Sequence, residues 1–131
     1  MATLERAVQI YAVVNFAVIG VSHALRPRDW LNFFALLRER GEAGVFAIAF
    51  PTLVFGSIVV AFHNVWSGIP LVLTLLGWAH VAKAVVYFAF PSFAFRKLQL
   101  SSRARPGSFV VAGVVSLLLA ALLGYHLWTT A

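Results

Sequence analysis

Four apolar segments, each about as long as a helix that crosses a bilayer, constrain this chain more than any other feature. They run over approximately residues 7–25, 43–62, 69–90 and 108–128. A transmembrane α-helix needs about 20 predominantly apolar residues. Of the 131 residues 62% are hydrophobic and only 11% are charged, which is too little charge for a soluble domain of this size. The sequence therefore predicts an all-α fold: one transmembrane domain over residues 1–131, built as a four-helix bundle from two hairpins.

The first apolar segment has a second interpretation, as a cleaved signal peptide. Residues 22–24, Ser-His-Ala, form a passable cleavage site. However, Glu5 offsets Arg6, so the leading region lacks the positive charge typical of a signal peptide apart from the amino terminus. We therefore interpret the segment as a membrane span.

The connection between the first two spans, residues 26–42, has a helical pattern of its own. Its large apolar residues Trp30, Phe33, Phe34 and Leu37 follow the spacing i, i+3, i+4 and i+7. This spacing predicts a short interfacial helix over about 28–40 that rests its aromatic face on lipid. The alternative is that this face is a docking surface for a partner.

The basic residues indicate how the chain is oriented. Eight of the ten lie in the two connections 26–42 and 91–107: Arg26, Arg28, Arg38, Arg40, Arg96, Lys97, Arg103 and Arg105. Cytoplasmic loops carry an excess of Lys and Arg, so both connections are expected in the cytoplasm and both termini on the non-cytoplasmic side. The same rule explains the formal charge of +6 without nucleic acid, so the expected partner is the lipid bilayer.

Ionisable and polar groups within the spans are the best candidates for a functional site. His80, Lys83 and Tyr87 share one stripe of the third span, and Asn15 lies midway along the first. Because a charge in hydrocarbon costs at least ~2.5 kcal/mol, such residues usually face a partner or a cavity. We expect a substrate or ligand site formed by Asn15, His80, Lys83 and Tyr87. The alternatives are that Lys83 snorkels to the interface or that the group is a purely structural network.

The connection between the second and third spans, His-Asn-Val-Trp-Ser-Gly-Ile-Pro at residues 63–70, suits a tight turn at the outer face. Trp66 fits the aromatic belt of a membrane, and Gly68 permits an unusual backbone angle. His63 and Asn64 are placed to cap the second span.

Catalytic and metal-binding patterns are missing from the sequence. The chain has no cysteine, and its four acidic residues all lie outside the apolar segments. His63 and His126 are the only histidines expected near one another, and neither has a carboxylate at metal-ligand spacing. We therefore expect no enzymatic activity, no metal and no cofactor such as haem.

A face of small residues on the fourth span suggests close helix packing. Ala112, Ser116, Ala120 and Gly124 recur every four positions. Small residues let transmembrane helices approach closely. We expect this face to support a homo-oligomer or a membrane complex; the alternative is that it packs within the bundle.

Part of the chain resembles a group of small, uncharacterised bacterial inner-membrane proteins. The shared pattern is His-Asn-x-Trp at residues 63–66, Thr-x-x-Gly-Trp at 74–78, then Lys83 and Pro91. The resemblance implies that His63, Asn64, Trp66, Gly77, Trp78 and Lys83 form one constellation in a bacterial inner membrane. It implies no function.

The leading functional expectation is a non-enzymatic accessory or scaffold subunit of an inner-membrane assembly. A second is a small oligomeric transporter or channel for an anion or amphipathic solute, which would use Asn15, His80 and Lys83. A third is a protein that binds a quinone or another lipid-soluble cofactor near His80 or His63.

Overall fold

The computed structural model describes residues 2–131, and these residues are helical apart from short connections. The elements are α1 (Ala2–Leu25), α2 (Pro27–Glu39), α3 (Glu42–Phe62), α4 (Pro70–Ala89), α5 (Pro91–Leu100), a short 3-10 turn (Ser101–Arg103) and α6 (Pro106–Thr129). Four of them, α1, α3, α4 and α6, are long and apolar enough to cross a membrane. The chain is an all-α, multi-pass membrane protein with four spans, as the sequence predicts.

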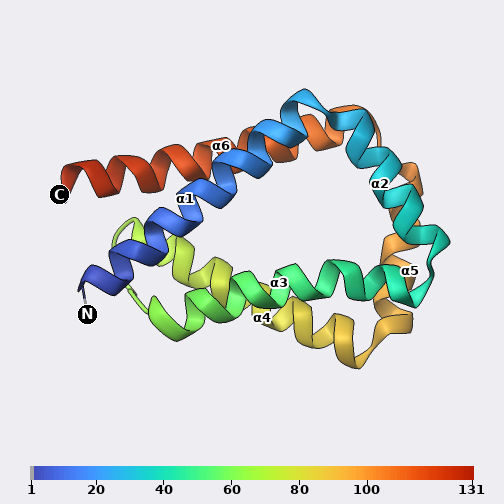
Figure 1. Ribbon diagram of the computed structural model, residues 1–131, viewed down its shortest axis with the longest axis horizontal. Helices are drawn as coiled ribbons and strands as arrows, with labels where there is room; N and C mark the ends of the chain where they lie inside the picture. Colours follow the sequence, from blue (N-terminus) through green and yellow to red (C-terminus); the bar gives the residue numbers. More distant parts are fainter. Residues whose placement is uncertain (1) are drawn as a thin grey trace.

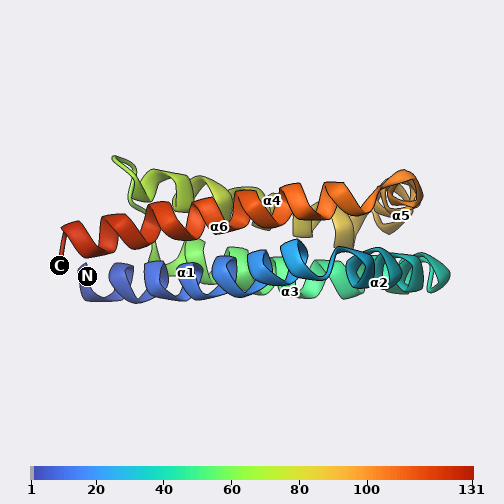
Figure 2. The same ribbon diagram turned by 90° about the horizontal axis from the view of Figure 1, so that it is seen from above.

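The four spans pack as two pairs, α1 with α6 and α3 with α4. The two pairs meet near the chain termini and diverge toward the other end, where α2 and α5 join them (Figure 1). Seen from above, α1 and α3 lie in one layer and α6 and α4 in the other (Figure 2). This pairing differs from two successive hairpins: the short connection 63–69 holds α3 beside α4, whereas α2 and α5 are long enough to carry the chain between pairs.

Two glycines allow α1 and α6 to cross in close contact. A Cβ atom at Gly113 would lie 2.7 Å from both the Ala24 nitrogen and the Gly20 oxygen, and a Cβ atom at Gly20 would lie 3.0 Å from the Gly113 oxygen. Nearby, the Ser116 hydroxyl donates to the Phe16 carbonyl over 2.8 Å. Small residues and interhelical hydrogen bonds are the main means by which membrane helices associate.

The same device joins α3 to α4. A Cβ atom at Gly77 would lie 2.4 Å from Val59 Cγ1, and one at Gly56 would lie 2.8 Å from the Val81 nitrogen and 2.9 Å from His80 Cβ. Because these two glycines have no side chain, the backbone of α3 lies directly against the face of α4 that carries His80.

The small-residue face of α6 is used within the chain. Ser116 bonds to α1, and Ala120 is buried. Ala112 is exposed, and a Cβ atom at Gly124 would meet nothing within 4 Å. Part of this face thus packs within the chain, as in the alternative interpretation, and the expected oligomer contact stays a prediction.

Apart from the core between the four spans, which includes Val8, Phe55 and Leu73, helices α2 and α5 form a small core of their own at the end opposite the termini. The predicted helix over 28–40 is present as α2, whereas α5 was not expected from the sequence. Leu37 of α2 and Leu98 of α5 are buried with Val45 and Ala94. Arg38 donates to the Ser101 hydroxyl over 2.6 Å. The two basic connections are therefore attached to each other.

Candidate functional site

A surface cavity of about 270 Å³ lies between α1, α3 and α4, where the two helix pairs begin to diverge. It is lined by Asn15, Phe16, Ile19, Pro51, Thr52, Phe55 and His80. These residues come from the middle of their spans, so the cavity lies near the middle of the bilayer. The structure thus brings together two of the four residues predicted for the ligand site, Asn15 and His80.

The polar groups of this cavity are held by their own helices. The Asn15 amide donates to the Tyr11 carbonyl over 2.9 Å, and the Thr52 hydroxyl donates to the Ile48 carbonyl over 2.7 Å. His80 Nδ1 lies 2.7 Å from the Leu76 carbonyl. Because a carbonyl only accepts, Nδ1 carries a hydrogen, and Nε2 of the neutral imidazole is then an acceptor.

The aromatic residues beside the cavity fix the His80 ring. The ring centroid of His80 lies 4.9 Å from that of Phe55, which in turn contacts Phe16 at 5.6 Å and Tyr11 at 5.8 Å. This cluster spans α1, α3 and α4. It positions the imidazole by packing, because aromatic pairs prefer tilted and offset arrangements at these separations.

Lys83 and Tyr87, the other two predicted site residues, lie apart from the cavity. The Lys83 ammonium is 5.3 Å from the centre of the Tyr87 ring, within cation–π distance. Lys83 is exposed on the surface of α4, and the part of the chain described, residues 2–131, offers it no hydrogen bond. This arrangement matches the snorkelling interpretation of Lys83 better than a packed polar site.

A group of fully buried polar side chains lies at the other end of the spans, near the termini. His63 follows α3 directly and is 0% exposed. Its Nε2 lies 3.1 Å from Gln9 Nε2, and its Nδ1 lies 3.1 Å from the Thr74 hydroxyl. Gln9 belongs to α1 and Thr74 to α4, so His63 connects the two helix pairs.

The hydrogens of this network can be assigned from its partners. The Thr74 hydroxyl donates to the Val65 carbonyl over 2.8 Å, so its oxygen accepts from His63 Nδ1–H. His63 Nε2 is then the acceptor for the Gln9 amide N–H. The chain of bonds requires a neutral imidazole. It leaves Gln9 Oε1 as a buried acceptor that has no protein partner among residues 2–131.

Burial explains the protonation state of His63. Loss of hydration lowers the pKa of its imidazole below the ordinary value, and a backbone hydrogen bond and, less strongly, the charge of Glu5 only partly oppose this effect. His126 lies near enough to lower the pKa slightly further. A neutral His63 is therefore the form that suits both its solvation and its hydrogen bonds.

The four residues of the predicted outer-face constellation have different environments. The Trp78 indole N–H donates to Asn64 Oδ1 over 3.4 Å, and Asn64 also bonds back to the Val60 carbonyl. Trp66 is 58% exposed and has no bond to the other three. His63 is the C-cap residue of α3, as expected: its backbone N–H donates to the Val59 carbonyl over 2.8 Å, while its side chain is buried in the core. Gly68 has a positive φ of 66°, as expected for the turn that returns the chain into α4.

A second cavity, of about 430 Å³, lies beside the His63 network. Among the residues that line it are Glu5, Arg6, Gln9 and His126. Arg6 donates to the Leu127 and Thr130 carbonyls, which ties α1 to the end of α6. No group of three His, Cys, Asp or Glu side chains within residues 2–131 is arranged to hold a metal ion.

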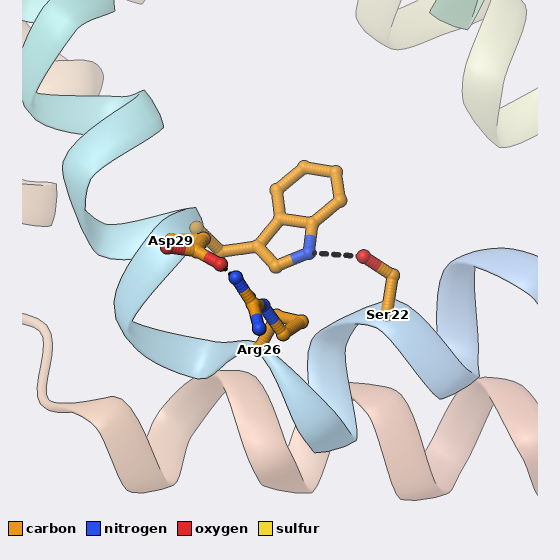
Figure 3. Close-up of polar contacts among 4 residues, drawn as sticks. Ser22, Arg26 and Asp29 are labelled. Atoms are coloured by element: carbon orange, nitrogen blue, oxygen red, sulfur yellow. Dashed lines mark hydrogen bonds and ion pairs between the residues drawn. The ribbon is translucent and has the colours of Figure 1, made fainter.

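The junction of α1 and α2 forms a third polar corner, at the opposite end of the molecule. The Trp30 indole N–H donates to the Ser22 hydroxyl over 2.9 Å, and Arg26 forms an ion pair with Asp29 (Figure 3). The Trp30 ring stacks on His23 with centroids 4.0 Å apart. Both charged residues of the ion pair are well exposed, so the pair contributes little to stability. The corner fixes the angle at which α2 leaves α1.

Comparison with known proteins gives no match to any protein family, curated protein or solved structure. The candidate sites are thus defined by geometry. Sequence reasoning missed Gln9 and Thr74 as partners of His63. The available signal was that both are polar residues inside apolar spans, at a depth close to that of His63.

Proposed function

We propose that this protein is a non-enzymatic accessory or scaffold subunit of a bacterial inner-membrane assembly. The observation that carries the proposal is the divergence of the two helix pairs (Figure 1). Each pair is closed by its own glycine crossing, but the backbones of the two pairs come close to each other at few places. A chain built in this way leaves much of its span surface for other transmembrane helices.

The exposed surface of the spans supports the same proposal. In the 18-residue apolar stretch of each span, only 22–28% of the residues are buried inside the chain. Large apolar residues on several faces remain uncovered, among them Val18, Phe50, Val54, Val85, Val111 and Leu118. Lipid can cover this apolar surface at no cost in free energy. A partner helix that replaces the lipid gains packing contacts with the surface. The partner is expected to be a different transmembrane protein.

The positions of the basic residues support cytoplasmic placement of α2 and α5. Both elements lie at the end of the molecule opposite the two termini (Figure 1). Arg38 and Ser101 join them directly. By the positive-inside rule this end faces the cytoplasm, and both termini face away from it.

Transport of an anion or amphipathic solute has less support. The expected site combined Asn15, His80 and Lys83, but Lys83 does not line the cavity that holds the other two. A transport path through this cavity would therefore lack a cationic group in its lining.

Photo-cross-linking in the membrane tests the proposal. A benzophenone amino acid at Val18 or Val54, both exposed in mid-span, is expected to trap a second transmembrane polypeptide. The same group at Ser67, in the loop between α3 and α4, is the matched control and is expected to trap none. Purification in mild detergent should recover the same polypeptide in a fixed ratio. Recovery of a self-oligomer alone, with no other polypeptide cross-linked, would contradict the accessory role.

A further inference from the structure

We propose that the cavity between α1, α3 and α4 binds a neutral, lipid-soluble molecule through a hydroxyl group on a ring, as in a quinol. We further infer that it prefers this reduced form to the corresponding quinone. The site is independent of the scaffold role proposed above, so either proposal can fail alone.

The first argument is the hydrogen-bonding capacity left at the cavity. Asn15, Thr52 and His80 each use a donor hydrogen on a carbonyl of their own helix. What remains is mainly acceptors: Asn15 Oδ1, the Thr52 oxygen and His80 Nε2. One Asn15 N–H is the only side-chain donor left. A bound molecule must therefore supply hydrogens, as a hydroxyl does.

The free acceptors also have space beside them. Gln9 Oε1, at the other end of the spans, is the one side-chain atom within residues 2–131 that is both buried and unpartnered. Asn15 Oδ1 and His80 Nε2 also lack protein partners, but they are not among the buried unpartnered atoms. Each of the two atoms therefore keeps some accessible surface. Both residues line the same cavity, which gives a ligand hydroxyl room to reach them.

The second argument is the shape and apolar character of the walls. Phe16, Ile19, Pro51 and Phe55 supply the rest of the lining, and Phe16 and Phe55 are in mutual ring contact at 5.6 Å. A dry cavity of about 150 Å³ in another protein holds one benzene molecule, so 270 Å³ accommodates a ring with its substituents. Aromatic walls favour a flat ring over a flexible chain.

The third argument is depth. All seven lining residues belong to the middle of membrane spans, where an ammonium or carboxylate on the ligand would be costly. A neutral hydroxyl avoids that cost. Because the cavity opens at the surface of the spans, its ligand reaches it from the bilayer, which selects a lipid-soluble molecule.

The preference for the reduced form follows from the same inventory. A quinol offers two hydroxyl hydrogens to the acceptors of the cavity, whereas a quinone offers only carbonyl oxygens. Sites built to hydrogen-bond a hydroxyl reject analogues that lack it, because buried polar groups are then left unpaired. The cavity thus distinguishes the two redox states by binding, without any electron transfer.

Binding to the purified protein in lipid nanodiscs tests the proposal. Three compounds with one short side chain are compared under anaerobic conditions: the quinol, its quinone and its dimethyl ether. The quinol is expected to bind at least about tenfold more tightly than either, as for the loss of one good hydrogen bond. A long-chain aliphatic alcohol, which has the hydroxyl without the ring, is expected to bind more weakly than the quinol. Equal affinities across these compounds, or no binding by the quinol, would overturn the assignment.

Substitutions locate the site. His80→Phe keeps a flat ring against Phe55 but removes the acceptor, so it is expected to reduce quinol affinity about tenfold and leave weak quinone binding unchanged. Thr52→Val, which nearly preserves volume, is a second variant in case the first fails to fold. His126→Phe, at the far end of α6, is the matched control and should bind as the parent does. Parent-like quinol affinity in both cavity variants would refute the proposed site.

Discussion

Replacing Gly113 by alanine should separate α1 from α6. The added methyl group would lie 2.7 Å from two backbone atoms of α1, the Ala24 nitrogen and the Gly20 oxygen. Ordinary contacts of a Cβ atom begin at 3.4 Å, so the helices must move apart by several tenths of an ångström. Neither obstacle is the end of a flexible side chain. Overpacking of this kind costs about 1–3 kcal/mol.

Gly124 in the same helix is the matched control. A Cβ atom there would meet nothing within 4 Å, so Gly124→Ala adds the same methyl group without a clash. Alanine favours a helix interior over glycine by up to about 1 kcal/mol. The control is therefore expected to be neutral or slightly more stable, and the two alanine variants should differ by at least about 1 kcal/mol.

Denaturation in mixed detergent micelles measures this difference in the free energy of unfolding. The four tryptophans provide an intrinsic fluorescence signal, so no label is needed. If Gly113→Ala is as stable as Gly124→Ala, the close crossing of α1 and α6 is wrong, and with it the pairing of the first span with the last.

Three further predictions concern pH, orientation and the exposed lysine. Burial lowers the pKa of His63, so the unfolded chain takes up a proton at this histidine at a higher pH than the folded chain does. The free energy of unfolding should therefore fall as the pH drops below about 6.5, by at most ~1.4 kcal/mol per pH unit. In thermal melts from pH 7.5 to 5, His63→Gln should flatten this pH dependence and His126→Gln should retain it. In intact cells Ser102→Cys should resist an impermeant maleimide, because it lies beside α5 at the end expected in the cytoplasm. Ser67→Cys should react, because it lies in the loop on the same side as the two termini. The reverse labelling would invert the topology. Lys83→Leu should leave the melting temperature in detergent unchanged or raise it. The substitution removes a charge that costs ~2.5 kcal/mol or more in the span, and it loses only a contact with the Tyr87 ring. Clear destabilisation would show that the amine has a polar partner.

The spans could be predicted because the signal is local. Twenty apolar residues in sequence make a span whatever surrounds them, and the observed bounds, such as Glu42–Phe62 for the expected 43–62, agree closely. Helix α2 was predictable from its aromatic spacing. Helix α5 has a weaker pattern over ten residues and was expected only as a loop.

The pairing of the spans could not be predicted because it depends on contacts between distant residues. Gly20 and Gly113 are separated by most of the chain, and nothing in either segment alone identifies the other as its partner. The stripe at every fourth residue of α6 pointed to close helix packing, and Ser116 does bond within the chain; the expected contact of this face with another chain stays a prediction.

The candidate site was predictable only in part for the same reason. Asn15 and His80 stood out as polar residues in apolar spans, and they do line one cavity. Lys83 shares a helical stripe with His80, but a stripe spans a wide arc, and here the amine lies outside the cavity. The burial of His63 depends on Gln9 and Thr74, which come from two other helices.

The pairing of the first span with the last has a consequence for biosynthesis. At about 5–20 residues per second, the ribosome needs roughly 5–20 s to extend the chain from the end of α1 to the end of α6. Throughout that time α1 occupies the membrane without the partner that accepts its glycine face, while α3 and α4 can already associate as a hairpin. The nascent first span, which carries Gln9 and Asn15 into hydrocarbon, is therefore the segment for which an insertase or chaperone in the membrane would matter most.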